Sequence, residues 1–130
     1  MWNYCTLLTS EELQKFESTF NFRIQQPLRS FLLEHNGGRS HHCIIPSLCK
    51  DRKLEQLLDF SATGNAWEIN RRMRKILGTR CIVIGTDRSE NFLCVTRAYN
   101  NQSVVIWNHV TGELEQCSLD IPALLDSWGS

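Results

Sequence analysis

The chain has 130 residues, of which 42% are hydrophobic and 22% charged, and its fourteen basic side chains balance fourteen acidic ones. These values suit one globular domain over residues 1–130 with its own core, and they exclude a disordered chain. Zero net charge also argues against direct nucleic-acid binding, because a basic surplus that neutralises phosphates supplies most of that affinity.

Hydropathy predicts a chain that makes no contact with a membrane. No window of the sequence approaches the roughly 20 apolar residues that a membrane helix needs. Charged side chains in the first thirty residues interrupt any signal-peptide core, namely Glu11, Glu12, Lys15, Glu17 and Arg23. We therefore expect a cytoplasmic protein whose six cysteines, none spaced as CxxC, stay reduced.

Two helices are predicted in the N-terminal part of the chain. Thr9 and Glu12 form a capping-box pattern that precedes apolar residues at helical spacing, which predicts a helix over about 10–19. Pro27 opens the second helix, because a proline in the first turn loses no needed hydrogen bond. The His-Asn-Gly-Gly run at 35–38 ends this helix and supplies a glycine for a left-handed cap.

The middle of the chain mixes both kinds of element. Residues 43–45 predict a short strand, whereas 53–60 fit either a helix or a strand, because the apolar residues there show both spacings. A helix follows over about 66–77. Its basic run at 71–75 predicts a solvated face near a helix C-terminus, where the helix dipole favours cations. Binding of nucleic acid or of an acidic partner is the alternative interpretation of that run.

The second half predicts a meander of four short strands joined by hairpin turns, over residues 81–84, 92–96, 104–107 and 114–117. Asn100 and Asn101 mark one turn, and Thr111 with Gly112 marks another. Asp120 then caps a last helix that has a proline in its first turn. The chain is therefore expected to be an α+β domain, with N-terminal helices and a C-terminal helix packed on a largely antiparallel sheet.

The ordered set of motifs resembles the SUKH superfamily, also described as SMI/KNR-like. Residues 27–38, a proline followed by an apolar helix and Asn-Gly-Gly, are similar to the N-terminal signature of that family. Residues 84–92 resemble its central hairpin, and 105–109 resemble the strand with an aromatic residue and a polar pair after it. Glu90 stands where the hairpin usually has glycine, so we expect the turn to avoid a glycine-only conformation.

The resemblance implies a fold and a role. It implies a non-catalytic immunity protein that binds and neutralises a cognate toxin domain, often a nuclease, of a bacterial polymorphic toxin system. An intracellular interaction scaffold or regulator of the same fold is the alternative that the family allows, because fold alone does not settle function.

The candidate partner contacts are polar residues on predicted turns and loops: Asp87, Arg88, Glu90 and Asn91 between two strands, Asn108 and His109 beyond Trp107, and Arg39 and His42 after the second helix. If the partner is a nuclease with a basic cleft, carboxylates on the first turn would take the positions of substrate phosphates. An ordinary solvated turn is the alternative. Trp107 itself is interpreted as a core residue.

The sequence offers weak patterns for a metal site and for catalysis. Possible metal ligands are His35, His41, His42, Cys43 and Cys49. Adjacent histidines on a strand would face opposite sides, and the paired cysteine spacing of structural zinc sites is missing. A nucleophilic triad can be assembled on paper from Cys43 or Cys94 with His109 and Asp87, but no cysteine signature surrounds it. We expect no enzyme, no metal and no cofactor.

Overall fold

The computed structural model describes residues 2–40, 42–97 and 102–128. Within these residues the chain forms four helices: α1 (Ser10–Phe20), α2 (Leu28–His35), α3 (Asn65–Leu77) and α4 (Ile121–Trp128). The strands are β1 (Ile44–Ile45), β2 (Arg52–Leu57), β3 (Cys81–Asp87), β4 (Phe92–Thr96), β5 (Val104–Trp107) and β6 (Leu114–Gln116). They form one antiparallel sheet in the order β1-β2-β3-β4-β5-β6, which confirms the predicted α+β class.

Both N-terminal helices begin at their predicted signals, and α2 also ends at its predicted one. The Thr9 hydroxyl accepts a hydrogen bond from the Glu12 backbone N–H at 3.1 Å, and the Glu12 carboxylate accepts one from the Thr9 N–H at 3.1 Å. This confirms the capping box. α2 follows Pro27 directly, and Gly37 after its end has a φ of 69°, the left-handed conformation expected of a helix-terminating glycine.

The ambiguous segment at 53–60 is not helical: residues 53–57 belong to strand β2, and 58–60 follow it. A β-bulge between Leu54 and Gln56 inserts an extra residue into the pairing with β3. Because the bulge shifts the in–out alternation by one position, Leu54 and Leu57 both point into the core and are fully buried. Their three-residue spacing imitates a helix, and only the neighbouring strands distinguish the two possibilities.

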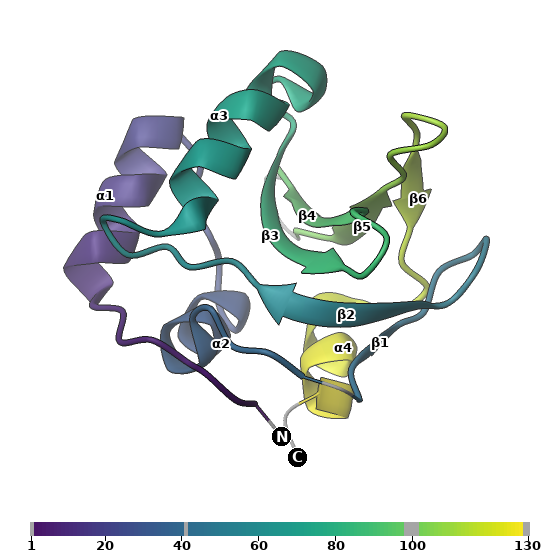
Figure 1. Cartoon of the computed structure of the whole chain (residues 1–130), viewed down its shortest axis with the longest axis horizontal. Coiled ribbons are helices and arrows are strands. Elements are labelled where there is room, and N and C mark those ends of the chain that lie inside the picture. Colours follow the sequence, from purple (N-terminus) through teal and green to yellow (C-terminus); the bar gives the residue numbers. More distant parts are fainter. Residues whose placement is uncertain (1, 41, 98–101, 129–130) are drawn as a thin grey trace.

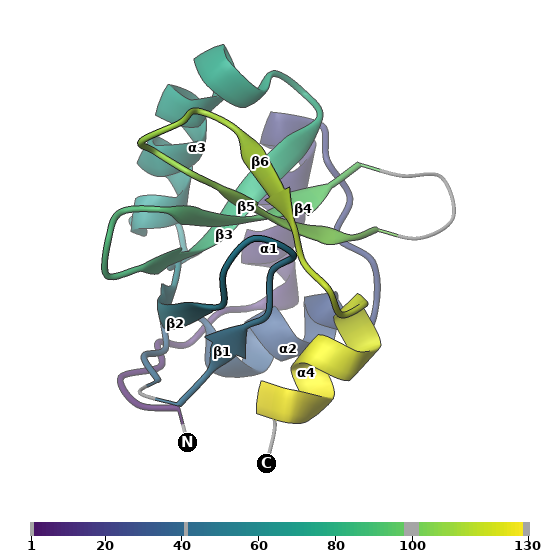
Figure 2. The same ribbon diagram turned by 90° about the vertical axis from the view of Figure 1, so that its right-hand side faces the viewer.

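The sheet curls until its two ends meet (Figure 1). Beyond β1, Leu48 N–H donates to the Gln116 carbonyl at 3.1 Å, and Ser118 N–H donates to the Pro46 carbonyl at 2.8 Å. Figure 2 shows the loop after β1 beside the segment that follows β6. The two edge strands are thereby partly covered by each other's flanking segments, which protects edges that would otherwise pair with another chain.

Aromatic contacts join the helices in two pairs. Phe16 of α1 packs edge-on against Trp67 of α3, with ring centroids 5.4 Å apart. Trp2 lies between Phe31 of α2 and Trp128 of α4, with centroids at 5.5 and 6.2 Å. The two ends of the described chain therefore meet, as Figures 1 and 2 show.

The cap of the last helix and the turn before β6 are confirmed as well. The Asp120 carboxylate accepts a hydrogen bond from the Ala123 N–H at 2.9 Å, which confirms the cap of α4. Gly112 closes the turn between β5 and β6 with a φ of 73°. The predicted turn at Asn100 and Asn101 lies outside the described residues. No helix of the described residues combines the length and the apolar character needed to cross a bilayer.

Candidate protein-binding groove

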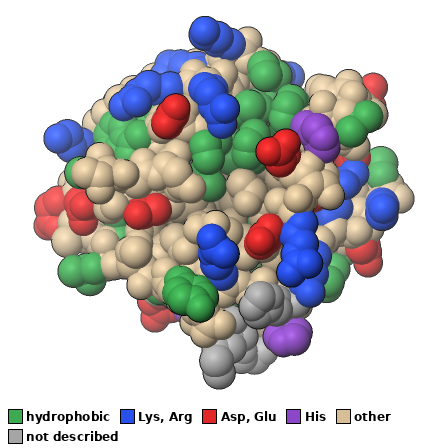
Figure 3. All heavy atoms as spheres, in the orientation of Figure 1, with side chains coloured by type: hydrophobic (Ala, Val, Ile, Leu, Met, Phe, Trp, Pro, Cys, Tyr) green, Lys and Arg blue, Asp and Glu red, His purple; other side chains and the backbone are tan. Residues whose placement is uncertain are grey.

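A groove of about 560 Å³ lies between α3 and the end of the β3–β4 hairpin, and we call it the α3–hairpin groove. Its helix side is a stripe at helical spacing, made of Ile69, Arg72, Met73 and Ile76. Its sheet side consists of Thr86, Asp87, Glu90, Phe92, Trp107 and His109. Figure 3 shows hydrophobic side chains gathered in this hollow, with Lys and Arg side chains above it, over α3.

The floor of the groove is apolar and partly open to solvent. Phe92 and Trp107 are cross-strand partners, and their rings stack with centroids 5.8 Å apart and an interplanar angle of 16°. Trp107 is half-buried, so the predicted core residue packs against the core and also lines the groove. On the helix side, Ile76 is 52% exposed. Exposed apolar surface rimmed by polar residues is typical of an interaction site.

The turn beside the groove is held together by the carboxylate of Asp87. One oxygen of this carboxylate accepts from the backbone N–H groups of Ser89 at 2.8 Å and Asn91 at 2.9 Å. The other accepts from the Asn91 side-chain amide at 2.9 Å. Both oxygens of Asp87 thus have internal partners, whereas the side chains of Arg88 and Glu90 at the tip are exposed.

Asn91 joins this turn to His109 on the neighbouring connection. Asn91 is only 3% exposed, and its side-chain oxygen accepts from the His109 backbone N–H at 3.0 Å. The same oxygen lies 2.9 Å from His109 Nδ1. Since that oxygen can only accept, Nδ1 carries the proton, and a neutral His109 ring presents Nε2 as an acceptor. Asn91 therefore positions its neighbours from a buried site.

The expectation that the turn avoids a glycine-favoured conformation is wrong. Glu90 has a φ of 64°, in the left-handed region. The hydrogen bonds of the Asp87 carboxylate fix the turn strongly enough to hold a residue with a Cβ there, although this conformation costs an L-residue about 1–2 kcal/mol.

Glu90→Gly should therefore raise the free energy of unfolding by roughly 0.5–1 kcal/mol, part of the strain being offset by the freedom of glycine in the unfolded chain. Chemical denaturation of the two proteins measures this difference. Ser89→Gly is the matched control, because Ser89 has no positive φ and glycine there should lower stability. Equal effects at the two positions would contradict the explanation.

Asn108 lies next to the groove but has an internal role. Its side-chain oxygen accepts from the N–H groups of Val110 at 2.9 Å and Thr111 at 3.3 Å, which shapes the β5–β6 turn. Its amide donates to Glu115 at 2.9 Å. The structure therefore brings Asp87, Glu90 and His109 together in the groove, whereas the Asn108 side chain stabilises the β5–β6 turn.

The other two candidate contacts do not line the groove. Arg39 makes isolated β-bridges with Asn3 and Gln56 and lines a separate cleft of about 400 Å³. His42 is exposed, and its backbone N–H donates to the Ser40 hydroxyl at 3.3 Å.

The cysteines and histidines singled out in the sequence do not converge on a metal in the described part of the chain. There, no three His, Cys, Asp or Glu side chains come together in a metal-binding arrangement, and His41 lies outside it. Burial raises the pKa of the Cys43 thiol. The hydrogen bond to Cys81, in which the Cys94 thiol donates, together with burial, raises the pKa of Cys94 well above its usual value. His109 Nδ1 contacts Asn91 instead of Asp87, so the histidine–aspartate contact that the hypothetical catalytic triad requires is not formed.

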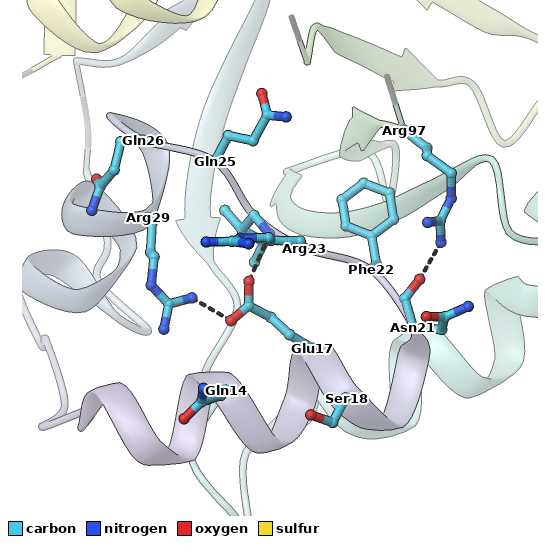
Figure 4. A pocket seen from close by; sticks show the side chains of 11 residues that line it. Gln14, Glu17, Ser18, Asn21, Phe22, Arg23, Gln25, Gln26, Arg29 and Arg97 are labelled. Atoms are coloured by element: carbon cyan, nitrogen blue, oxygen red, sulfur yellow. Dashed lines mark hydrogen bonds and ion pairs between the residues drawn. The ribbon is translucent and has the colours of Figure 1, made fainter. Parts of the chain in front are cut away.

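A larger cleft, of about 860 Å³, lies between α1 and the segment at 21–26 (Figure 4). Three of its charged side chains are engaged within the protein: Glu17 pairs with Arg29 and also accepts from the Ile24 N–H at 2.7 Å. Arg97 donates to the carbonyl of Asn21. Because these groups join α1 to the following segment, the cleft has the character of a polar packing seam.

Sequence reasoning missed the helix side of the groove. Ile69 and Ile76 are seven residues apart and so share a face of α3. That face borders the buried one, whose members are Ala66, Asn70, Met73 and Leu77, and it shares Met73 with it. An apolar surface wider than the buried face of a helix indicates that part of it lies outside the core.

The comparisons with known proteins agree with this architecture. The model of the SMI1 / KNR4 family (SUKH-1) matches residues 7–127. Comparisons with curated proteins and with solved structures give no match. The matching family is generally associated with immunity proteins of polymorphic toxin systems, and its members are generally non-catalytic. Because the match spans nearly the whole chain, from before α1 to the last turn of α4, this protein belongs to the SMI1 / KNR4 family (SUKH-1).

Proposed function

We propose that this protein is a cytoplasmic immunity protein that binds and neutralises the cognate toxin domain of a bacterial polymorphic toxin system, and that the toxin is a nuclease. The observation that carries the proposal is the α3–hairpin groove, an open apolar floor with acidic side chains at its edge. Family membership supports the general role, and the groove supplies a surface suited to it.

The acidic turn favours a nuclease among toxin classes. A nuclease cleft carries cations that bind phosphates, and it attracts any carboxylate placed in the same position. Glu90 is the carboxylate that can contact a partner, because it is exposed and forms no ion pair with any of the described residues. Asp87 keeps its negative charge nearby while its oxygens hold the turn.

The stacked aromatic rings give the interface its centre. A specific protein–protein interface buries about 800 Å² on each partner, and a few aromatic or arginine anchors carry most of its energy. Phe92, Trp107 and Arg72 are residues of these types in one groove. The polar turn residues around them form the rim of such an interface.

Glu90→Arg should weaken binding of the cognate toxin domain, which we would seek first in the product of the gene next to this one, by about tenfold or more, because it places like charges across the interface. Titration calorimetry of the purified pair measures the dissociation constant, and inhibition of nuclease activity gives a second readout. Glu90→Gln is the matched control: it keeps the left-handed backbone and the side-chain size, and it should weaken binding less.

Asp87 is unsuitable for this test, because any replacement would also release the turn that presents Glu90. If the Glu90→Arg variant binds the toxin domain as tightly as the wild type, the hairpin is not part of the interface. Failure of the wild-type protein to bind or inhibit the neighbouring gene's product would reject the immunity role.

A further inference from the structure

We infer that the α3–hairpin groove binds its partner segment in one orientation and disfavours the reverse one. The partner segment places a large apolar side chain on the Phe92–Trp107 floor, a cationic side chain at the hairpin rim and an anionic side chain at Arg72. This inference rests on the proposed function and names the chemistry of the toxin segment that the groove accepts.

The hairpin rim is built to receive a cation. Glu90 contributes an exposed carboxylate, and Asp87 adds negative charge beneath it. His109 faces the same groove, and its Nδ1 is occupied by Asn91, so its free nitrogen is an acceptor when the ring is neutral. Acceptors of this kind suit a guanidinium or an ammonium group.

The helix rim has the opposite charge. Arg72 lines the groove and is exposed. The ion pairs of the described residues are Glu17–Arg29, Glu34–His35 and Glu115–Arg52, so Arg72 has no ion-pair partner among those residues. Glu68 stands one turn earlier on α3 but makes no such pair with it. Arg72 is therefore available to a carboxylate of the partner.

The opposed rims, rather than either alone, set the direction. A groove of about 560 Å³ holds a few side chains, since pockets for small ligands span about 300–1,000 Å³. A segment that enters in reverse would bring its cation to Arg72 and its anion to Glu90, and each contact would be repulsive. A one-sign patch would lack this discrimination.

Panning short random peptides displayed on phage against the full-length protein tests the inference without the toxin. We expect the enriched peptides to share a large apolar residue flanked by a basic residue on one side and an acidic residue on the other. We then synthesise a peptide selected on the wild-type protein. Arg72→Glu and Glu90→Arg should each lower the affinity of the protein for this peptide by about tenfold. The double variant should select peptides with the two charges exchanged.

Two exposed neighbours on α3 that do not line the groove provide matched controls, namely Arg74→Glu and Lys75→Glu. Each should leave peptide affinity within about twofold of wild type, because its charge lies off the groove. Thermal melts of all variants verify the fold. Panning that enriches no common motif, or a motif whose charges do not follow the double exchange, overturns the inference.

The outcomes separate this inference from the proposed function. If the protein binds the toxin but the panned peptides share no charged residues, the immunity role stands and the preference for one orientation is rejected. A directional motif without binding of the neighbouring toxin supports the groove chemistry and assigns the groove to a different protein partner.

Discussion

Asn70→Ala should lower the free energy of unfolding by about 3 kcal/mol, because it leaves buried backbone groups without partners, at about 1–3 kcal/mol each. Asn70 is 5% exposed and clamps α3 onto β3. Its amide donates to the carbonyls of Ala66 at 2.9 Å and Val83 at 3.0 Å, and its oxygen accepts from the Val83 N–H at 2.8 Å. Among the described residues, Asn70 is the partner of the Val83 backbone on that side, because β2 pairs with β3 only from Gly85 onward.

Urea denaturation followed by tryptophan fluorescence measures this loss. Asn70→Asp keeps the shape of the side chain but cannot donate to the Val83 carbonyl, so it should destabilise as well. Glu68→Ala, at an exposed position of the same helix, should change stability by less than about 0.5 kcal/mol. A small effect at Asn70 would mean that packing alone fixes α3, and the groove would then not depend on this clamp.

Glu115→Ala should cost a similar amount, about 3 kcal/mol, because it leaves the largely buried Arg52 guanidinium without its partner. The pair is bidentate, with Arg52 Nε 3.0 Å and Nη2 2.9 Å from the two carboxylate oxygens. The side chains of Arg52 and Glu115 are 15% and 10% exposed. Asn108 donates to the same carboxylate at 2.9 Å. The pair joins β2 to β6, which are not neighbours in the sheet, and so fastens its closing ends.

A double-mutant cycle with Arg52→Ala measures the coupling. The double variant should be less destabilised than the sum of the single variants, because no charge is left unpaired. Additive losses would show that the two side chains act independently and that the backbone contacts alone close the sheet.

Acid should weaken the same contact. The hydrogen bond from Arg52 holds the pKa of the Glu115 carboxyl below its usual value of 4.5. The unfolded chain therefore takes up the proton first as the pH falls, so this stabilisation is present above pH 4.5 and is lost as the pH falls through the folded pKa. Glu115→Gln should flatten the pH dependence of stability in that acidic range. An unchanged slope would assign acid sensitivity to other carboxylates.

The sequence alone determined the elements that depend on near neighbours. A capping box needs only Thr9 and Glu12, and a helix stop needs only a glycine that tolerates a positive φ, as Gly37 does. The order of these local signals was also enough to indicate the family, which the match over residues 7–127 then established. Such signals act within about one helical turn, so no tertiary contact is required to interpret them.

Only the tertiary structure decided which distant residues meet. The bulge at Leu54 turned a helix-like spacing into a strand, and the curl of the sheet brought Arg52 to Glu115. Packing of α3 placed Arg72 across the groove from Glu90. It also separated Asp87 and Asn91, which hold the turn, from the Glu90 side chain at its tip, although the sequence presents all three as one polar run. Register, bulges and helix docking depend on burial and backbone pairing across the whole domain, and periodicity along a short segment carries no record of them.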